Sequence, residues 1–288
     1  MRTIQNQTFD EERALYGLRE TLVRDCTFDG PADGESAFKE CADVEADHCF
    51  FNLRYPFWHD EHLTIRNSEM TELCRAALWY SHHIEIADTK LHGIKALREC
   101  SDVKMTGCDI VSPEFGWSVH NIEMEDCDAR RSTYDALHGS AFPQRADEES
   151  TPSSTSRMLC SRTATSTPRT PSGTPKNVVV RNSTVKGEYL AWYCENVTFE
   201  NCTIIGTQPL CYCQGLKLIN CKMVDCDLAF ERSHVQASLT APILSIKNPL
   251  TGSRITVPQV GEIIRDIEGA GGEVEVQKGP EKKECHCA

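Results

Sequence analysis

The chain reads Val178-Val179-Val180-Arg181-Asn182-Ser183-Thr184-Val185 and, nineteen residues later, Val197-Thr198-Phe199-Glu200-Asn201-Cys202-Thr203-Ile204. Each copy alternates apolar and polar residues, turns at Asn-Ser or Asn-Cys, and then resumes with an apolar residue. A repeat of this length is too short for two helices and matches one coil of a solenoid. The sequence therefore predicts stacked β-strand rungs.

The same rung recurs along most of the chain, with a small residue at its turn. The turn positions are Cys26, Cys49, Ser68, Thr89, Cys108, Cys127, Ser183, Cys202 and Cys221. The strand before each turn alternates strictly, which indicates one face in and one face out. We expect these side chains to point inward: Leu63, Ile65, Ile84, Ile86, Val103, Met105, Val197 and Phe199. The predicted fold is all-β, a single-stranded right-handed parallel β-helix with about 19–21 residues per rung.

The rung pattern also divides the chain. The predicted divisions are an N-terminal segment (1–12), a first block of rungs (13–129), an aberrant segment (130–175), a second block of rungs (176–247), and a C-terminal cap with a tail (248–288). Within the cap, residues 260–266 look like a short amphipathic helix that closes the open end of the sheet.

The aberrant segment is rich in Ser, Thr and Pro, a composition typical of disorder. The neighbouring codon frame of residues 156–175 can nevertheless encode Ile-Glu-Asn-Val-Val-Phe-Glu-Asp-Cys-Asn-Leu-Asp-Thr-Lys-Asp-Ala-Phe-Trp-Asn-Thr, which is itself a rung. We therefore interpret 130–175 as the product of a frameshift, natural or a sequencing error. We expect this segment to pack poorly and to disrupt the stack.

Composition and net charge restrict the cellular location and the binding partners that we expect for this chain. The net charge of −13 argues against a nucleic-acid backbone or an anionic membrane as partner. No secretory leader is evident in residues 1–12, and no apolar run approaches the roughly 20 residues of a membrane helix. Sixteen cysteines in such a chain indicate free thiols in a reducing cytoplasm. We expect no cofactor, and the oligomeric state stays open.

One column of equivalent rung positions collects all four tryptophans and two cations: Lys39, Trp58, Trp79, Arg98, Trp117 and Trp192. Their immediate neighbours form an apolar column, and adjacent strand residues face opposite ways. The tryptophan column is therefore either an exposed stripe that could bind an oligosaccharide or glycan, or half-buried packing at a corner. Tryptophan is usually largely buried, which favours packing.

A polar column precedes the strands and includes His62 and His83, with Glu61 and His82 beside them. Strand spacing would stack the two histidines about 4.8 Å apart. Two histidines and a carboxylate can bind a divalent metal. A polar turn ladder is the simpler explanation, so we expect no metal here.

Several rungs resemble a known family. They are Tyr55-Pro56-Phe57-Trp58, Ala77-Leu78-Trp79-Tyr80, Glu188-Tyr189-Leu190-Ala191-Trp192-Tyr193, Leu210-Cys211-Tyr212 and Lys247-Asn248-Pro249. With residues 260–266, they are similar to a bacterial family of unknown function. The resemblance implies a pectin-lyase-like right-handed parallel β-helix and no established activity, and fold does not carry function.

Two classes of function follow. A non-catalytic carbohydrate-binding or scaffold role is favoured, and the alternative is a polysaccharide-active enzyme, a pectate-lyase-like lyase or a glycoside hydrolase. A hydrolase needs two carboxylates about 5–10 Å apart. Glu40, Glu99 and Glu231 share a column but lie rungs apart, so no catalytic residue is assigned.

Overall fold

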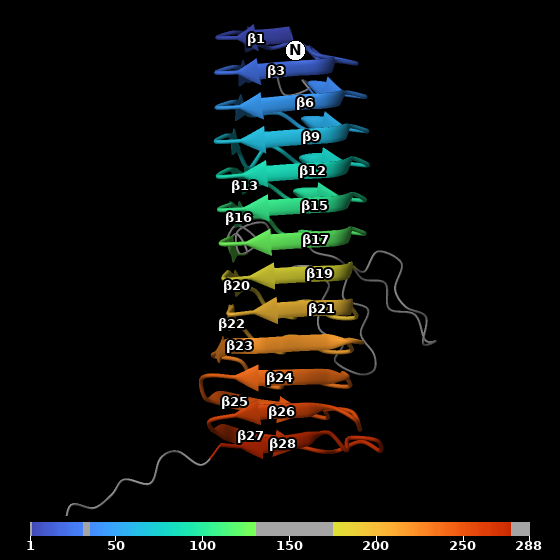
Figure 1. Ribbon diagram of the computed structural model, residues 1–288, viewed down its shortest axis with the longest axis vertical. Helices are drawn as coiled ribbons and strands as arrows, with labels where there is room; N and C mark the ends of the chain where they lie inside the picture. Colours follow the sequence, from blue (N-terminus) through green and yellow to red (C-terminus); the bar gives the residue numbers. More distant parts are fainter. Residues whose placement is uncertain (1, 31–34, 131–174, 278–288) are drawn as a thin grey trace, which may run out of the picture.

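The computed structural model describes residues 2–30, 35–130 and 175–277. These residues form an elongated solenoid of stacked parallel strands, with the N-terminus at one end (Figure 1). The expected parallel β-solenoid is thus confirmed. Its right-handed winding stays a prediction.

Each rung contributes one long strand to a main sheet that runs the length of the solenoid. In order of pairing these strands are β1 (Arg2–Gln5), β3 (Arg19–Arg24), β6 (Ala42–Asp47), β9 (Glu61–Arg66), β12 (His82–Ala87), β15 (Ser101–Thr106), β17 (His120–Glu125), β19 (Lys176–Arg181), β21 (Glu195–Glu200), β23 (Leu216–Val224), β24 (Val235–Leu239), β26 (Arg254–Val257) and β28 (Glu273–Val276). The pairing is in register, with Ile84 beside Leu63 and Val103.

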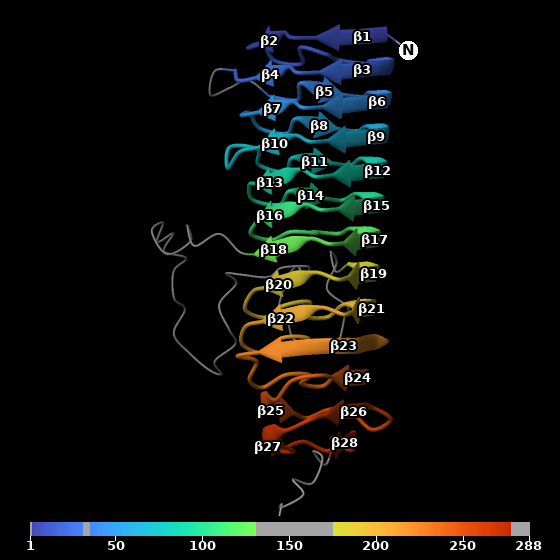
Figure 2. The same cartoon turned by 60° about the vertical axis from the view of Figure 1, so that its left-hand side comes forward.

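Shorter strands close the other sides of each rung (Figure 2). One sheet contains β2 (Thr8–Phe9), β4 (Thr27–Phe28), β7 (Phe50–Phe51), β10 (Glu69–Met70), β13 (Lys90–His92), β16 (Asp109–Val111), β18 (Asp128–Arg130), β20 (Thr184–Lys186) and β22 (Thr203–Ile205), and joins the second half of β23. A small sheet contains β5 (Phe38–Lys39), β8 (Phe57–Trp58), β11 (Leu78–Trp79) and β14 (Leu97–Arg98). Near the C-terminus β25 (Ile243–Lys247) pairs with β27 (Val260–Ile264).

The interior is a continuous apolar column. The eight side chains that the alternation placed inward are each at most 2% exposed. Phenylalanines fill the N-terminal third, where Phe28 stacks on Phe51 with ring centroids 4.9 Å apart. Burial of each large side chain contributes roughly 1.5–3 kcal/mol, which is why the period of the repeat sets the fold.

Two kinds of corner residue join the strands. The small turn residues are buried as expected, and hydroxyls among them accept backbone N–H groups from the preceding rung: Ser68 Oγ accepts from Cys49 N at 3.0 Å. From β3 to β21, the second residue of each strand of the main sheet has a positive φ, for example 53° at His62 and 56° at Asn121. Asn, Asp and His tolerate this left-handed region better than other side chains, which explains the polar column.

Two expectations need correction. Residues 260–266 do not form a helix: Val260–Ile264 is strand β27, because the edge of β25 offers a parallel partner. The stack is also not disrupted between the two blocks, since β17 pairs directly with β19 through Ile122 and Val178. The frameshift interpretation concerns residues 130–175, of which 131–174 lie outside the described residues.

Nothing helical in the described ranges has the length and apolar character needed to cross a bilayer.

Candidate functional site

The tryptophan column of the first block lies in register on the small sheet. Lys39 pairs with Trp58, Trp58 with Trp79, and Trp79 with Arg98, while Arg98 bridges to Trp117. All five side chains are half-buried. The structure therefore supports the packing alternative over a freely exposed stripe.

The ring faces in this column are covered by neighbours. Trp58 and Trp79 stack with centroids 5.0 Å apart and planes 8° apart. Lys39 Nζ lies 4.1 Å from the Trp58 ring centre, and the Arg98 guanidinium lies 4.4 Å from that of Trp79. Trp117 carries Lys95 Nζ at 4.4 Å. Because the faces stack along the solenoid axis, a sugar ring cannot stack on them without displacing a rung neighbour.

Trp192 does not belong to this surface. Its side chain is 4% exposed, and its indole N–H donates to Gln208 O at 2.6 Å. The residue before it, Ala191, has a φ of 53°, whereas the equivalent Phe57 and Leu78 do not have positive φ. The extra left-handed residue turns Trp192 into the core.

We expect Arg98→Met to lower the free energy of unfolding by about 1 kcal/mol, because a guanidinium over an indole and an ion pair with Glu99 at 3.2 Å are both lost. Urea denaturation measures this. Arg254→Met is the control, since Arg254 pairs with Glu273 on an open surface at 3.4 Å and its loss should change stability little. Equal effects of the two changes would contradict a stabilising cation–π contact.

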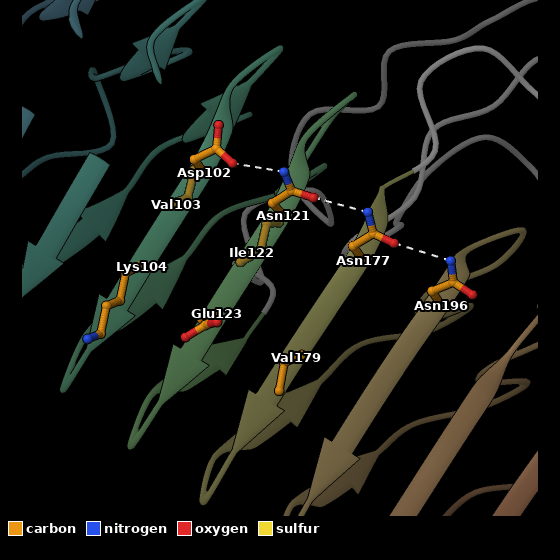
Figure 3. A pocket seen from close by; sticks show the side chains of 9 residues that line it. All are labelled: Asp102, Val103, Lys104, Asn121, Ile122, Glu123, Asn177, Val179 and Asn196. Carbon is orange, nitrogen blue, oxygen red and sulfur yellow. Dashed lines mark hydrogen bonds between the residues drawn. The ribbon is translucent and has the colours of Figure 1, made fainter. Parts of the chain in front are cut away.

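A groove follows the outer face of the main sheet beside the polar corner. Its largest part has a volume of about 580 Å³ (Figure 3). A second hollow of about 320 Å³ shares Asp102 and Lys104 with it. The two hollows run from His62 on β9 to Asn196 on β21. Across these successive rungs the groove spans roughly 24 Å at a strand spacing of about 4.8 Å.

One wall of the groove is a ladder of hydrogen-bonded side chains (Figure 3). Asn121 Nδ2 donates to Asp102 Oδ1 at 2.8 Å, Asn177 Nδ2 to Asn121 Oδ1 at 3.0 Å, and Asn196 Nδ2 to Asn177 Oδ1 at 3.2 Å. Hydrogen bonds from Asn121 and Ser101 lower the pKa of Asp102, so this carboxylate stays ionised. The sequence located this column as a turn ladder, but bonds between side chains of successive rungs were not foreseen.

The structure brings together three of the four possible metal ligands. Glu61, His62 and His83 lie side by side, with the two imidazole rings stacked at 4.8 Å. His82 pairs with Glu61 across the strands but is not part of this group, and its Nδ1 lies 2.9 Å from Ser101 Oγ.

Sequence reasoning missed a buried carboxyl group. Asp60 is 1% exposed, and its Oδ1 accepts Cys41 N at 2.8 Å. Its Oδ2 has no hydrogen-bond partner among the described residues, and burial raises the pKa of Asp60 to about 8. The sequence did contain a signal that position 60 is buried. The equivalent residues in the two neighbouring rungs, Cys41 and Ser81, are small, and both are buried in the structure.

A family model described as "Protein of unknown function (DUF3737)" matches residues 2–275, so the chain belongs to that family. The resemblance to a family of unknown function is thus confirmed. No curated protein matches the chain.

Among solved structures the chain is similar to PfbA, a surface adhesin of Streptococcus pneumoniae, with 10% identity, coverage of 90% of this chain and 74% of that one, and a TM-score of 0.44. The A-module of the Azotobacter vinelandii mannuronan C-5 epimerase AlgE6 has 12% identity, 96% and 78% coverage, and a TM-score of 0.33. The tailspike protein 3 of bacteriophage CBA120 has 11% identity and a TM-score of 0.25, and the match covers 96% of this chain and 50% of that one. These likenesses carry no argument about function.

Proposed function

We propose that this member of the DUF3737 family is a non-catalytic glycan-binding protein whose ligand lies along the groove of the main sheet. The observation that supports the proposal is the carboxamide ladder, which repeats a donor and an acceptor at every rung from Asn121 to Asn196. Amide and carboxylate groups match the hydroxyls of a polymer, and their repetition suits an extended ligand.

The charges of the groove favour a neutral glycan. Asp102, Glu85 and Glu123 line it, against the single cation Lys104 in the two hollows described above. The net charge of the whole chain is −13. An acidic polysaccharide would meet repulsion both locally and at a distance. The cations Lys39 and Arg98 of the tryptophan column are engaged on indole faces.

The carboxyl groups support binding without turnover. Asp60 has the raised pKa that a general acid needs, but it faces the interior rather than the groove. The three glutamates that share a column each have a partner: Tyr16 for Glu40, Arg98 for Glu99 and Lys247 for Glu231. A pair of carboxylates cooperating across one scissile bond is not assembled from these three.

The cysteines support a cytoplasmic location as part of the same proposal. Those in the described ranges are buried, and they fill corner positions. They pack as small residues whose thiols are weak donors, for instance Cys202 Sγ, which donates to Val180 O at 3.3 Å. A reducing compartment keeps them in that form.

The test is calorimetric titration with neutral and acidic oligosaccharides. We expect Asn177→Gly to weaken binding of a neutral oligosaccharide about tenfold, which is the loss of roughly one or two hydrogen bonds. Glycine preserves the backbone, because Gly215 occupies the same corner column two rungs after Asn177, with a φ of 68°.

Asn201→Gly is the matched control. Asn201 also has a positive φ and bonds along a ladder, to Asn182 Oδ1 at 3.3 Å, but it lies at another corner outside the groove. Trp79→Ala should bind like the wild type. Loss of binding in Trp79→Ala alone would transfer the site to the tryptophan column, and no binding by the wild type would leave a scaffold role.

A further inference from the structure

At the N-terminal end of the groove, Glu61, His62 and His83 converge from two neighbouring rungs. Glu61 Oε1 lies 2.5 Å from His83 Nδ1 and 3.8 Å from His62 Nε2. One ligand atom from each of the three residues lies within 4.8 Å of the other two. We propose that these three side chains form a binding site for one zinc ion.

The donor set matches zinc chemistry. Two imidazole nitrogens and a carboxylate oxygen are a set that leaves a fourth position open on a tetrahedral ion. With metal–ligand bonds of about 2.0–2.1 Å, neighbouring ligand atoms of a tetrahedron lie about 3.3 Å apart. The two separations between Glu61 and the histidines, 2.5 and 3.8 Å, bracket this value, and all three ligand atoms lie within 4.8 Å of one another. The proposal requires rotation of these side chains and no movement of the paired strands.

The fold positions the two histidines in advance. His62 and His83 have φ values of 53° and 54° at equivalent positions of β9 and β12, so their rings leave the backbone in the same direction and stack at 20°. Strand pairing places Glu61 of β9 beside His82 of β12, and the Glu61 carboxylate reaches His83 Nδ1 at 2.5 Å. Parallel pairing thus sets the spacing between the ligands.

A second carboxylate lies near His83, at a distance that a rotation of the ring would have to shorten to form a hydrogen bond. Asp102 Oδ2 lies 3.9 Å from His83 Nε2, the ring nitrogen opposite the one that faces Glu61. A metal-bound histidine commonly directs its other N–H to a carboxylate, which holds the ring and its tautomer. Asp102 is itself held by Asn121 at 2.8 Å and by Ser101 at 2.9 Å.

The fourth position faces the groove, because His62, His83 and Asp102 all line its second hollow. Water or a hydroxyl of a bound molecule can reach an ion held there. Zinc binding does not depend on the proposed glycan binding, and zinc alone is sufficient to test it.

The experiment is calorimetric titration of Zn²⁺ into the full chain carrying Cys285→Ser and Cys287→Ser, since Cys285-His286-Cys287 offers soft ligands of its own. We expect one zinc ion per chain, and a rise in the unfolding temperature with zinc. His83→Asn and His62→Asn should each weaken binding at least about tenfold. Asparagine suits the site because Asn121 holds the same column at a φ of 56°.

His48→Asn provides the control: the residue type, the substitution and the left-handed backbone are the same, with a φ of 52°, but the corner is different. It should bind zinc like the parent chain. Urea midpoints check that each variant is folded, and Glu61→Gln serves as a third ligand variant. Unchanged zinc affinity in His62→Asn, His83→Asn and Glu61→Gln, or no binding by the parent chain, would overturn the proposal.

Discussion

Asp60→Ser is expected to stabilise the protein at pH 7 by an amount on the order of 4 kcal/mol. Asp60 is buried with one carboxyl oxygen unpaired, and burial raises its pKa from 3.8 to about 8. Serine fits this interior column, since Ser81 and Ser233 occupy equivalent places and Ser233 Oγ accepts Cys213 N at 2.9 Å. Serine at position 60 can therefore still accept Cys41 N.

The stability of the wild type should depend on pH in a defined direction. Because the folded pKa of Asp60 lies above the unfolded value, the folded chain holds an extra proton between about pH 4 and 8. The stabilising contribution of the protonated form is complete below about pH 4 and is lost as the pH rises toward 8. Urea denaturation between these limits should show wild-type stability falling relative to Asp60→Ser.

Asp10→Ser is the control for this experiment, because it removes the same charge from an exposed position. The stability difference between Asp10→Ser and the wild type should be nearly constant over the same pH range. A difference between Asp60→Ser and the wild type that does not grow with pH would contradict a buried, protonated Asp60.

The second large effect is expected for Phe51→Ala, which should destabilise the protein by about 3–5 kcal/mol. Phe51 is fully buried, and its ring lies 4.9 Å from that of Phe28 and 5.1 Å from that of Phe57. Truncation leaves a cavity on the solenoid axis, and each rung depends on contact with its neighbours. Chemical denaturation with circular dichroism as the signal measures the change.

Two further substitutions test whether the cavity in the stack of phenylalanine rings causes the loss of stability. Phe51→Leu keeps most of the volume and should cost less than about 1.5 kcal/mol. Phe9→Ala removes an end ring that is half-buried and stacks on Phe28 at 5.0 Å, so its cost should be smaller than that of Phe51→Ala. If Phe9→Ala costs as much as Phe51→Ala, the stack of rings is not the source of the stability.

Sequence patterns were sufficient to predict the features that follow from the two-residue period of a β-strand and from local backbone conformation. The alternation around Leu63 and Phe199 determined which faces are buried, because successive strand residues point to opposite sides. The polar corner was readable for a related reason: a left-handed residue is needed at His62, Asn121 and their equivalents, and few side chains tolerate it.

Sequence patterns were insufficient to predict the features that depend on contacts with residues of another rung. The apolar spacing of residues 260–266 fits a helix as well as a strand, and the edge of β25 decided for a strand. The exposure of the tryptophan column could not be read either. Ala191 turns Trp192 inward, while Lys39 and Arg98 cover Trp58 and Trp79 from the rungs on either side.

The sequence by itself determined a parallel β-solenoid, its inward faces and the residue types at its corners, since all three follow from the repeat and from local backbone sterics. Only the tertiary structure decided what the corner side chains do. Asn121 and Asn177 bond one another, His62 and His83 converge on Glu61, and Asp60 loses its solvent. Each of these depends on which residue the neighbouring rung places about 4.8 Å away, which no single rung contains.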